Sequence, residues 1–212
     1  MAKLGFPGSS SISIQSALKR LAISCLIVCG CAHAQDAYKP ESVRVSNLPT
    51  LMARSHDPSD VLLTSLDTIL QDKEVCCGKD SALEDSAQRA DPSSLQDVAT
   101  KLQGRHLLSD GRPIMVTAEY ISPDAINASL LVETLQKKHA MLLLWKSHLY
   151  VLYGATYIVD FDPNSGIVSY NVRTLLLIDT RYSDSRRNVE FNRTTDDWTK
   201  VQGVLWLTAA PQ

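Results

Sequence analysis

Hydrophobic and polar residues follow two different periods along this chain. Between Asp60 and Leu70 (DVLLTSLDTIL) apolar residues recur every three or four positions, which is the spacing of an amphipathic helix. Good helix formers and capping residues predict further helices over Gly78–Arg89 and Ser93–Leu102. Another helix is predicted from Ser122 to Leu135, with a proline in its first turn. The first half of the chain is therefore predicted to be mainly helical, and the last of these helices lies in the second half.

Short apolar runs bounded by turn residues dominate the second half. Lys146 and Ser147 separate two of these runs, as in a hairpin, and Pro163–Gly166 (PNSG) is typical of a tight turn. Helices first and an antiparallel sheet afterwards predict an α+β fold. The predicted strands span residues 114–120, 140–145, 148–153, 157–161, 167–170, 175–178 and 201–208.

Residues 1–34 have the composition of an export signal. Two basic residues precede the uncharged apolar stretch Leu21–Gly30. The stretch is followed by an Ala-His-Ala sequence that ends at Ala34 and has small residues at the two positions that a signal peptidase recognises. Cleavage is expected between Ala34 and Gln35, which gives an exported, periplasmic or secreted protein. A stretch of about ten apolar residues is too short to span a bilayer, so no stable membrane span is expected. An alternative interpretation makes Cys31, at the end of a Val-Cys-Gly-Cys sequence, a lipid anchor.

One domain is expected after the signal. Residues 35–59 are polar and contain three prolines, which favours an extended lead-in, and the domain proper is predicted over residues 60–212. Removal of residues 1–34 takes away three of 21 basic residues and no acidic ones, leaving 18 against 23, a net charge of about −5. A mildly acidic chain without a basic block argues against a nucleic-acid partner.

Two adjacent cysteines, Cys76 and Cys77, are the main chemical signal. Adjacent cysteines do not make a disulfide framework, and they lack the spacing of a zinc site, so neither metal nor cofactor is expected. Cys77 stands at the start of a predicted helix, where the helix N-terminus lowers the pKa of a thiol. Gln71, six residues upstream, could donate its side-chain amide to an oxyanion.

A histidine and a carboxylate follow the cysteines in the order that acyl-transfer chemistry needs. His148 opens a predicted strand, and Asp162 follows it near the end of another. A nearby histidine activates a thiol as a thiolate–imidazolium pair. Asp160 lies two positions before Asp162 and faces the same side of a strand, so it is the alternate orienter of the imidazole. Cys76 is the alternate nucleophile.

These residues resemble those of papain-like cysteine peptidases, in which glutamine, cysteine, histidine and carboxylate occur in this order. Cys77–Leu83 (CGKDSAL), Ser147–Gly154 (SHLYVLYG) and Phe161–Pro163 (FDP) are most similar to the bacteriocin-processing branch. The resemblance covers about residues 60–178 and implies a papain-like fold. It also implies these roles: Cys77 as nucleophile, His148 as general base, Asp162 as its orienter and Gln71 as oxyanion donor.

The expected function is therefore thiol-dependent hydrolysis of peptide bonds by an exported enzyme. Three alternatives stay open. A transglutaminase-like acyltransferase would keep the nucleophile and pass the acyl group to an amine. A catalytically inactive papain-like domain would bind a peptide or an envelope partner. A thiol redox sensor would use the pair Cys76 and Cys77.

Overall fold

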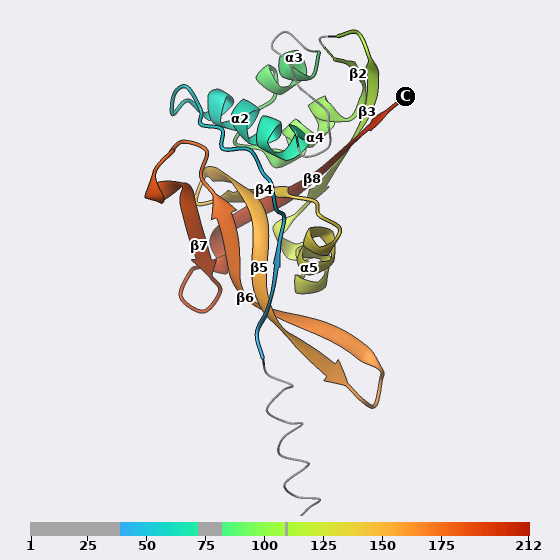
Figure 1. Ribbon diagram of the computed structural model, residues 1–212, viewed down its shortest axis with the longest axis vertical. Helices are drawn as coiled ribbons and strands as arrows, with labels where there is room; N and C mark the ends of the chain where they lie inside the picture. The colour runs from blue at the N-terminus through green and yellow to red at the C-terminus, as the bar shows by residue number, and fades with distance from the viewer. Residues whose placement is uncertain (1–38, 72–81, 109) are drawn as a thin grey trace, which may run out of the picture. The chain divides into compact units, whose positions relative to one another are not determined.

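In the computed structural model, residues 40–212 are built around an antiparallel sheet of eight strands (Figure 1). The structure describes residues 39–71, 82–108 and 110–212. The order of strands across the sheet is β2-β3-β8-β4-β5-β6-β7, and β1 pairs with β5. Their bounds are β1 Glu41–Arg44, β2 Gly104–Leu107, β3 Pro113–Ile121, β4 Met141–Trp145, β5 His148–Asp162, β6 Ile167–Ile178, β7 Asn188–Asn192 and β8 Val201–Pro211.

Strand β5 is the longest, with 15 residues, and it organises the sheet. Its first residues, 148–152, pair with β4, and residues 154–157 pair with β1 on the same side. Strand β6 runs along its other side as far as Asp162. Gly154 permits β1 to approach, because a Cβ at this position would lie 2.8 Å from the carbonyl oxygen of Val43.

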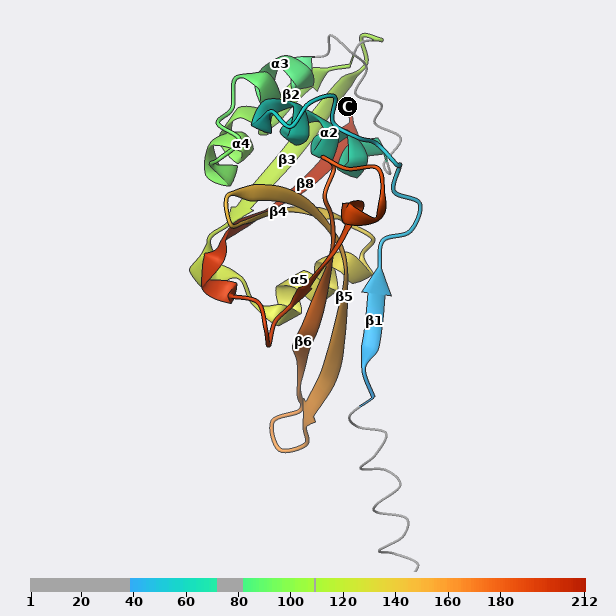
Figure 2. The same cartoon turned by 90° about the vertical axis from the view of Figure 1, so that its left-hand side faces the viewer.

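Two groups of helices cover the sheet (Figure 2). Helices α2, α3 and α4 lie together, where α2 packs against β5 and β8, and α4 packs against β3 and β8. Helix α5 packs against β1, β5 and β6. The helices are α2 Pro58–Gln71, α3 Ala82–Gln88, α4 Leu95–Leu102 and α5 Ala128–Gln136, and the 3₁₀ turns are η1 Pro123–Ala125, η2 Ser185–Arg187 and η3 Trp198–Lys200.

Local sequence explains where these helices begin. The Ser94 hydroxyl accepts a hydrogen bond from the backbone N–H of Asp97 and caps α4, whose four apolar residues are all buried. Asn127 caps α5 by accepting from the N–H of Leu130. Helix α5 therefore starts later than the predicted Ser122, because a 3₁₀ turn and this cap precede it.

The core lies between the central strands and the two helical groups. All five residues of β4 are buried, and Leu62, Leu66 and Ile69 of α2 pack into the same core. Each such side chain contributes about 1.5–3 kcal/mol relative to an exposed one. Within the described ranges no helix has both the length and the apolar composition that a membrane crossing requires.

The prediction of a papain-like α+β fold is wrong. The described structure is mostly antiparallel sheet with few helices, and strands come before, between and after those helices. Strand β1 precedes α2, and β2 and β3 separate α4 from α5. The sequence prediction placed helices first because it missed the short strands β1 and β2, and it missed β7 as well. It also divided β5 and β6, each of which is one continuous strand, into two.

Candidate functional site

The predicted nucleophile falls outside the part of the chain that the structure describes. Cys76 and Cys77 belong to residues 72–81, and the predicted export signal and Cys31 belong to residues 1–38, all outside the described residues. Gln71 is the last residue of α2, and its side chain is also outside them. The candidate site is therefore built from His148 and its neighbours.

The structure does not bring His148 and Asp162 together. They are the first and last residues of β5, and fourteen steps of about 3.3 Å place them roughly 45 Å apart along the strand. Asp162 instead accepts hydrogen bonds from the Ser165 hydroxyl (2.6 Å) and the Asn164 N–H (2.9 Å), which lower the pKa of its carboxyl group. It therefore caps the turn between β5 and β6. Asp160 lies in the same outer part of β5, so neither aspartate is the predicted orienter of His148.

Gln71 is not brought together with His148 either. His148 shares a cavity with Pro58 and Val61, which belong to the first turn of α2. Gln71 lies ten residues beyond Val61, or about 15 Å along the helix axis at 1.5 Å per residue. The helix therefore separates the predicted oxyanion donor from the predicted base.

A two-residue turn fixes the position of His148. Lys146 and Ser147, between β4 and β5, both have positive φ angles, of 51° and 61°, as a type I′ hairpin turn requires. The Ser147 N–H donates to the side-chain oxygen of Gln202 at 2.8 Å, which ties the turn to β8. The hairpin predicted at these two residues is confirmed, and it presents His148 beside Arg181.

The partner of His148 is an arginine. The Arg181 guanidinium donates from Nη1 to Nδ1 of His148 at 3.0 Å. A guanidinium has no acceptor, so Nδ1 accepts, and the neutral imidazole carries its proton on Nε2. In a thiolate–imidazolium pair the neighbour of the histidine is an anion, whereas here it is a cation. The neighbourhood of His148 therefore differs in charge from that of the predicted triad.

A buried carboxylate holds Arg181 in place. Asp179 is 3 % exposed, and it accepts from the backbone N–H of Arg181 at 3.1 Å and from Nε at 2.8 Å. Its second oxygen accepts from Nη2, so the pair is bidentate. These hydrogen bonds raise the pKa of the Arg181 guanidinium. Tyr150 and Tyr182 place their ring centroids 5.9 and 5.7 Å from the guanidinium carbon. Arg181 is therefore fixed from several sides.

His148 and Arg181 line a cavity of about 100 Å³, which we call the hairpin cavity. His56 supplies a third basic side chain, and its ring meets the ring of Tyr182 edge-on at 5.5 Å. A cavity of this size admits a small polar group. Its remaining lining residues are Pro58, Val61, Pro92, Ser93, Leu144, Ser147 and Leu149.

Hydrogen bonds join the two chain segments that carry His56 and Arg181. The Ala53 N–H donates to the carbonyl of Thr180 at 2.8 Å. The Arg187 guanidinium donates to the carbonyl oxygens of Leu51 and Pro49. The Thr180 hydroxyl also meets the Ser65 hydroxyl of α2 at 3.1 Å, where both residues are fully buried. The hairpin cavity is therefore held in shape by tertiary contacts.

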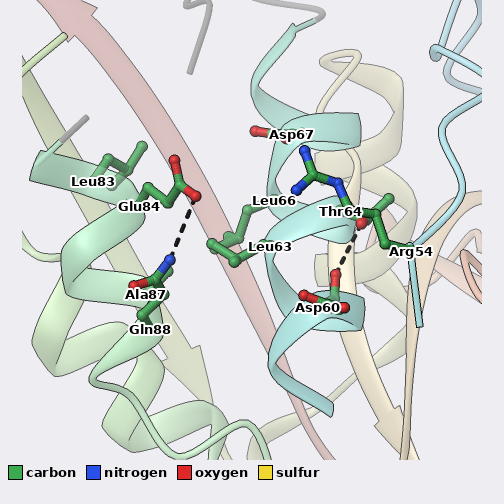
Figure 3. A pocket seen from close by; sticks show the side chains of 10 residues that line it. All are labelled: Arg54, Asp60, Leu63, Thr64, Leu66, Asp67, Leu83, Glu84, Ala87 and Gln88. Atoms are coloured by element: carbon green, nitrogen blue, oxygen red, sulfur yellow. Dashed lines mark hydrogen bonds between the residues drawn. The ribbon is translucent and has the colours of Figure 1, made fainter. Parts of the chain in front are cut away.

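A second cavity, of about 220 Å³, lies between α2 and α3 (Figure 3), and we call it the α2–α3 cavity. Asp60 and Asp67 line it from α2, and Glu84 lines it from α3. Gln88 donates to the Glu84 carboxylate at 3.4 Å, and Arg54 supplies the cation. Burial, and then the charge of Glu84, raise the pKa of Asp67 to about 6. This cavity therefore takes up a proton in mildly acidic solution.

Sequence reasoning found His148 but missed the residues beside it. Asp179, Arg181 and His56 follow no motif, since each lies in a loop and reaches the cavity only through tertiary structure. An Asp-x-Arg sequence directly after an apolar run was the one available signal. No protein-family model and no curated protein matches the chain.

Proposed function

We propose that this protein is a binding domain, and that its hairpin cavity takes one carboxylate of a peptide or protein partner. The observation that carries the proposal is the fixed Arg181 guanidinium, which shares the cavity with His148. Arginine in a fixed position recognises carboxylates through paired, charge-assisted hydrogen bonds. The Nε2–H of His148 is a further donor.

Charge and shape both support a small acidic group as the ligand. Residues 179–187 contain three arginines and two aspartates, and two histidines face the same cavity. Its volume suits the end of an acidic side chain or a C-terminal carboxylate, while Val61, Leu144 and Leu149 offer apolar contact to the attached aliphatic carbons. The partner would therefore insert one residue and bind elsewhere on the surface with the rest.

The test uses propionate as a carboxylate probe and propionamide as its neutral analogue. We expect propionate, titrated into the ¹⁵N-labelled protein, to shift the imidazole signals of His148 and His56, with a dissociation constant of about 1–10 mM for so small a ligand. Propionamide should shift them less. Equal responses to both probes, or none to propionate, would overturn the proposal.

Two variants localise the effect. Arg181→Gln keeps an amide donor but removes the charge, and we expect it to weaken propionate binding about tenfold, or 1.4 kcal/mol. Arg112→Gln is the matched control, because Arg112 also pairs with a nearby aspartate but is exposed. It should bind propionate as the parent does. A loss shared by both variants would indicate non-specific attraction.

Thiol-dependent peptidase activity stays a prediction from the sequence, as does export. A peptidase would lose hydrolysis of a denatured protein substrate in Cys77→Ala. A binding domain has no turnover above the level of that variant. The pH dependence of Cys77 alkylation by iodoacetamide, in the parent and in His148→Ala, gives a second readout. Rapid labelling well below a thiol pKa of about 8.5, lost in His148→Ala, would restore the enzyme hypothesis.

A further inference from the structure

The outer part of the β5–β6 hairpin extends beyond the strands that flank its base (Figure 1). We call this part the arm; it consists of residues 158–162 of β5 and 167–172 of β6. Its strands pair with each other from Ile158 opposite Asn171 to Asp162 opposite Ile167. The turn is closed by a hydrogen bond from the Gly166 N–H to the Asp162 carbonyl. The arm is therefore a regular two-stranded ribbon.

One face of the arm is apolar along its whole length. Val159 lies opposite Tyr170, and Phe161 lies opposite Val168, so these four side chains share a face. The stripe continues inward to the buried residue Tyr157, whose ring meets that of Tyr170 at 5.4 Å. Exposure increases toward the tip, where Phe161 is 62 % and Val168 48 % exposed. The face of the sheet that is buried in the core therefore continues onto the arm, where its apolar side chains are exposed to solvent.

The two edges of the arm differ in charge. Strand β7 covers β6 from Thr174 to Ile178, and the Arg193 N–H bonds to the Arg173 carbonyl. From Ile167 to Val172 (IVSYNV) no described strand pairs with this edge, which carries neither charge nor proline. The β5 edge is likewise unpaired beyond β1, but Asp160 and Asp162 stand on it.

Soluble proteins protect exposed strand edges, most often with charged residues or proline, because an unprotected edge attracts another strand. The aspartates protect the β5 edge in this way, whereas the β6 edge lacks such protection. A two-stranded ribbon with an apolar face is marginally stable in water by itself and gains stability when a further strand pairs with its edge. The β6 edge is therefore suited to pair with a partner that supplies a further strand with an apolar face.

We propose that this partner is a second copy of the chain, and that the β6 edges of two copies pair antiparallel in a symmetric dimer. Pairing of β6 with β6 uses the same surface on both chains, so it closes at two copies. Pairing of a β5 edge with a β6 edge would be head-to-tail and open-ended. The aspartates on β5 oppose that alternative, so the charge pattern selects the closed dimer.

A register in which Ser169 of one copy lies opposite Ser169 of the other gives favourable side-chain pairs across the two β6 strands. Val168 of each copy then lies opposite Tyr170 of the other, a β-branched residue against an aromatic ring, which is a favourable cross-strand pair. The two-fold axis runs perpendicular to the ribbon and keeps both apolar stripes on one face. Four strands then share a continuous apolar face.

Sedimentation velocity over a concentration series tests the dimer, with the full chain and two variants. Val168→Asp puts a charge on the unprotected edge at an exposed position, so we expect a correct fold and a dimer about tenfold weaker or more. Leu107→Asp is the matched control, because Leu107 is an exposed apolar residue (52 %) at the end of β2, another edge strand. It should dimerise as the parent does.

Hydrogen exchange of the parent supplies a second, independent measurement. Amides of residues 167–172 should become more protected as concentration rises, while those of β2 should not change. A parent that is monomeric throughout the series would overturn the proposal. So would a dimer that Val168→Asp leaves intact, or one that both variants weaken equally. Propionate binding is measured in the hairpin cavity, away from the arm, so this result is independent of the proposed binding function.

Discussion

The two cavities beside helix α2 differ in how their charges are arranged. In the hairpin cavity, Arg181 meets the buried Asp179 in a bidentate pair, and its Nη1 donates to Nδ1 of His148. In the α2–α3 cavity, Asp67 and Glu84 carry the same charge and come from facing helices (Figure 3). The hairpin cavity joins opposite charges in a partly buried pair, whereas the α2–α3 cavity brings carboxylates together beside the cation Arg54.

The two cavities beside α2 are therefore expected to differ in how they respond to ligands and to pH. The carboxylate of Asp179 favours the ionised form of Arg181 and raises the pKa of the guanidinium, so the hairpin cavity keeps its donors in place. Like charges near each other disfavour ionisation, and burial adds to that effect, which is why the pKa of Asp67 rises to about 6. We therefore expect ligand recognition in the hairpin cavity and pH sensitivity in the α2–α3 cavity.

The largest expected effect comes from breaking the opposite-charge pair. Asp179→Asn leaves Arg181, with a side chain only 16 % exposed, without its counter-charge. Removing one partner of a buried pair costs about 3–5 kcal/mol, and we expect roughly 2–4 kcal/mol here because Arg181 is partly exposed. The measurement is the free energy of unfolding from urea denaturation.

The matched control for that variant is Asp110→Asn. Asp110 pairs with Arg112 in the same two-residue spacing, but both side chains are at least half exposed. Exposed pairs contribute about 0–1 kcal/mol, so this variant should unfold almost as the parent does. Equal losses in the two variants would show that burial of Asp179 has no special role.

Some parts of this fold could be predicted from local sequence. The spacing of Leu95, Val98, Ala99 and Leu102 predicts the buried face of α4, because a helix face depends only on residues within two turns. Strand β1 (ESVR) has no such pattern, since its stability comes from pairing with residues more than a hundred positions away. Short strands of this kind are determined by tertiary structure.

The site shows the same limit. The sequence prediction ended the His148 strand before Gly154, because glycine interrupts strand patterns. In the structure Gly154 lies inside β5, where β1 approaches too closely for a side chain. Because β5 is one continuous strand, Asp162 lies at the opposite end from His148. The sequence prediction placed both residues on strands correctly but paired them wrongly. The contact between His148 and Arg181 joins positions 33 apart and has no local signature.

The next effect concerns pH and the like-charge cavity. The folded-state pKa of Asp67 is about 6, against an ordinary value of 3.8, so the folded protein binds the extra proton between these values. The contribution of Asp67 to stability therefore falls as pH rises from about 4 to about 6, and stays lower above that range. A two-unit shift corresponds to about 3 kcal/mol, which solvent screening of a partly exposed group reduces to roughly 1–2 kcal/mol.

Asp67→Asn should remove this penalty. We expect the variant to be more stable than the parent by that amount at pH 8 and to show no gain at pH 4, as measured by urea denaturation at both values. Asp85→Asn is the control, since Asp85 is an exposed carboxylate on the neighbouring helix α3. It should show no comparable gain at pH 8. A gain of equal size at pH 4 and pH 8 would show that the effect is not titration of Asp67.

The smallest expected effect separates the two causes of the Asp67 shift. Glu84→Gln removes the charge but keeps a side chain of the same size beside Gln88. The pKa of Asp67 should then fall, yet stay above 3.8, because burial is the larger cause and remains. NMR titration of the Asp67 carboxyl carbon measures this directly, and Glu133→Gln on α5, at an exposed position, is the control. A pKa that fell all the way to 3.8 would make Glu84 the dominant cause. An unchanged pKa would make the α2–α3 cavity a place where a single carboxylate is buried, and the contrast with the hairpin cavity would then be one of burial and not of paired charges.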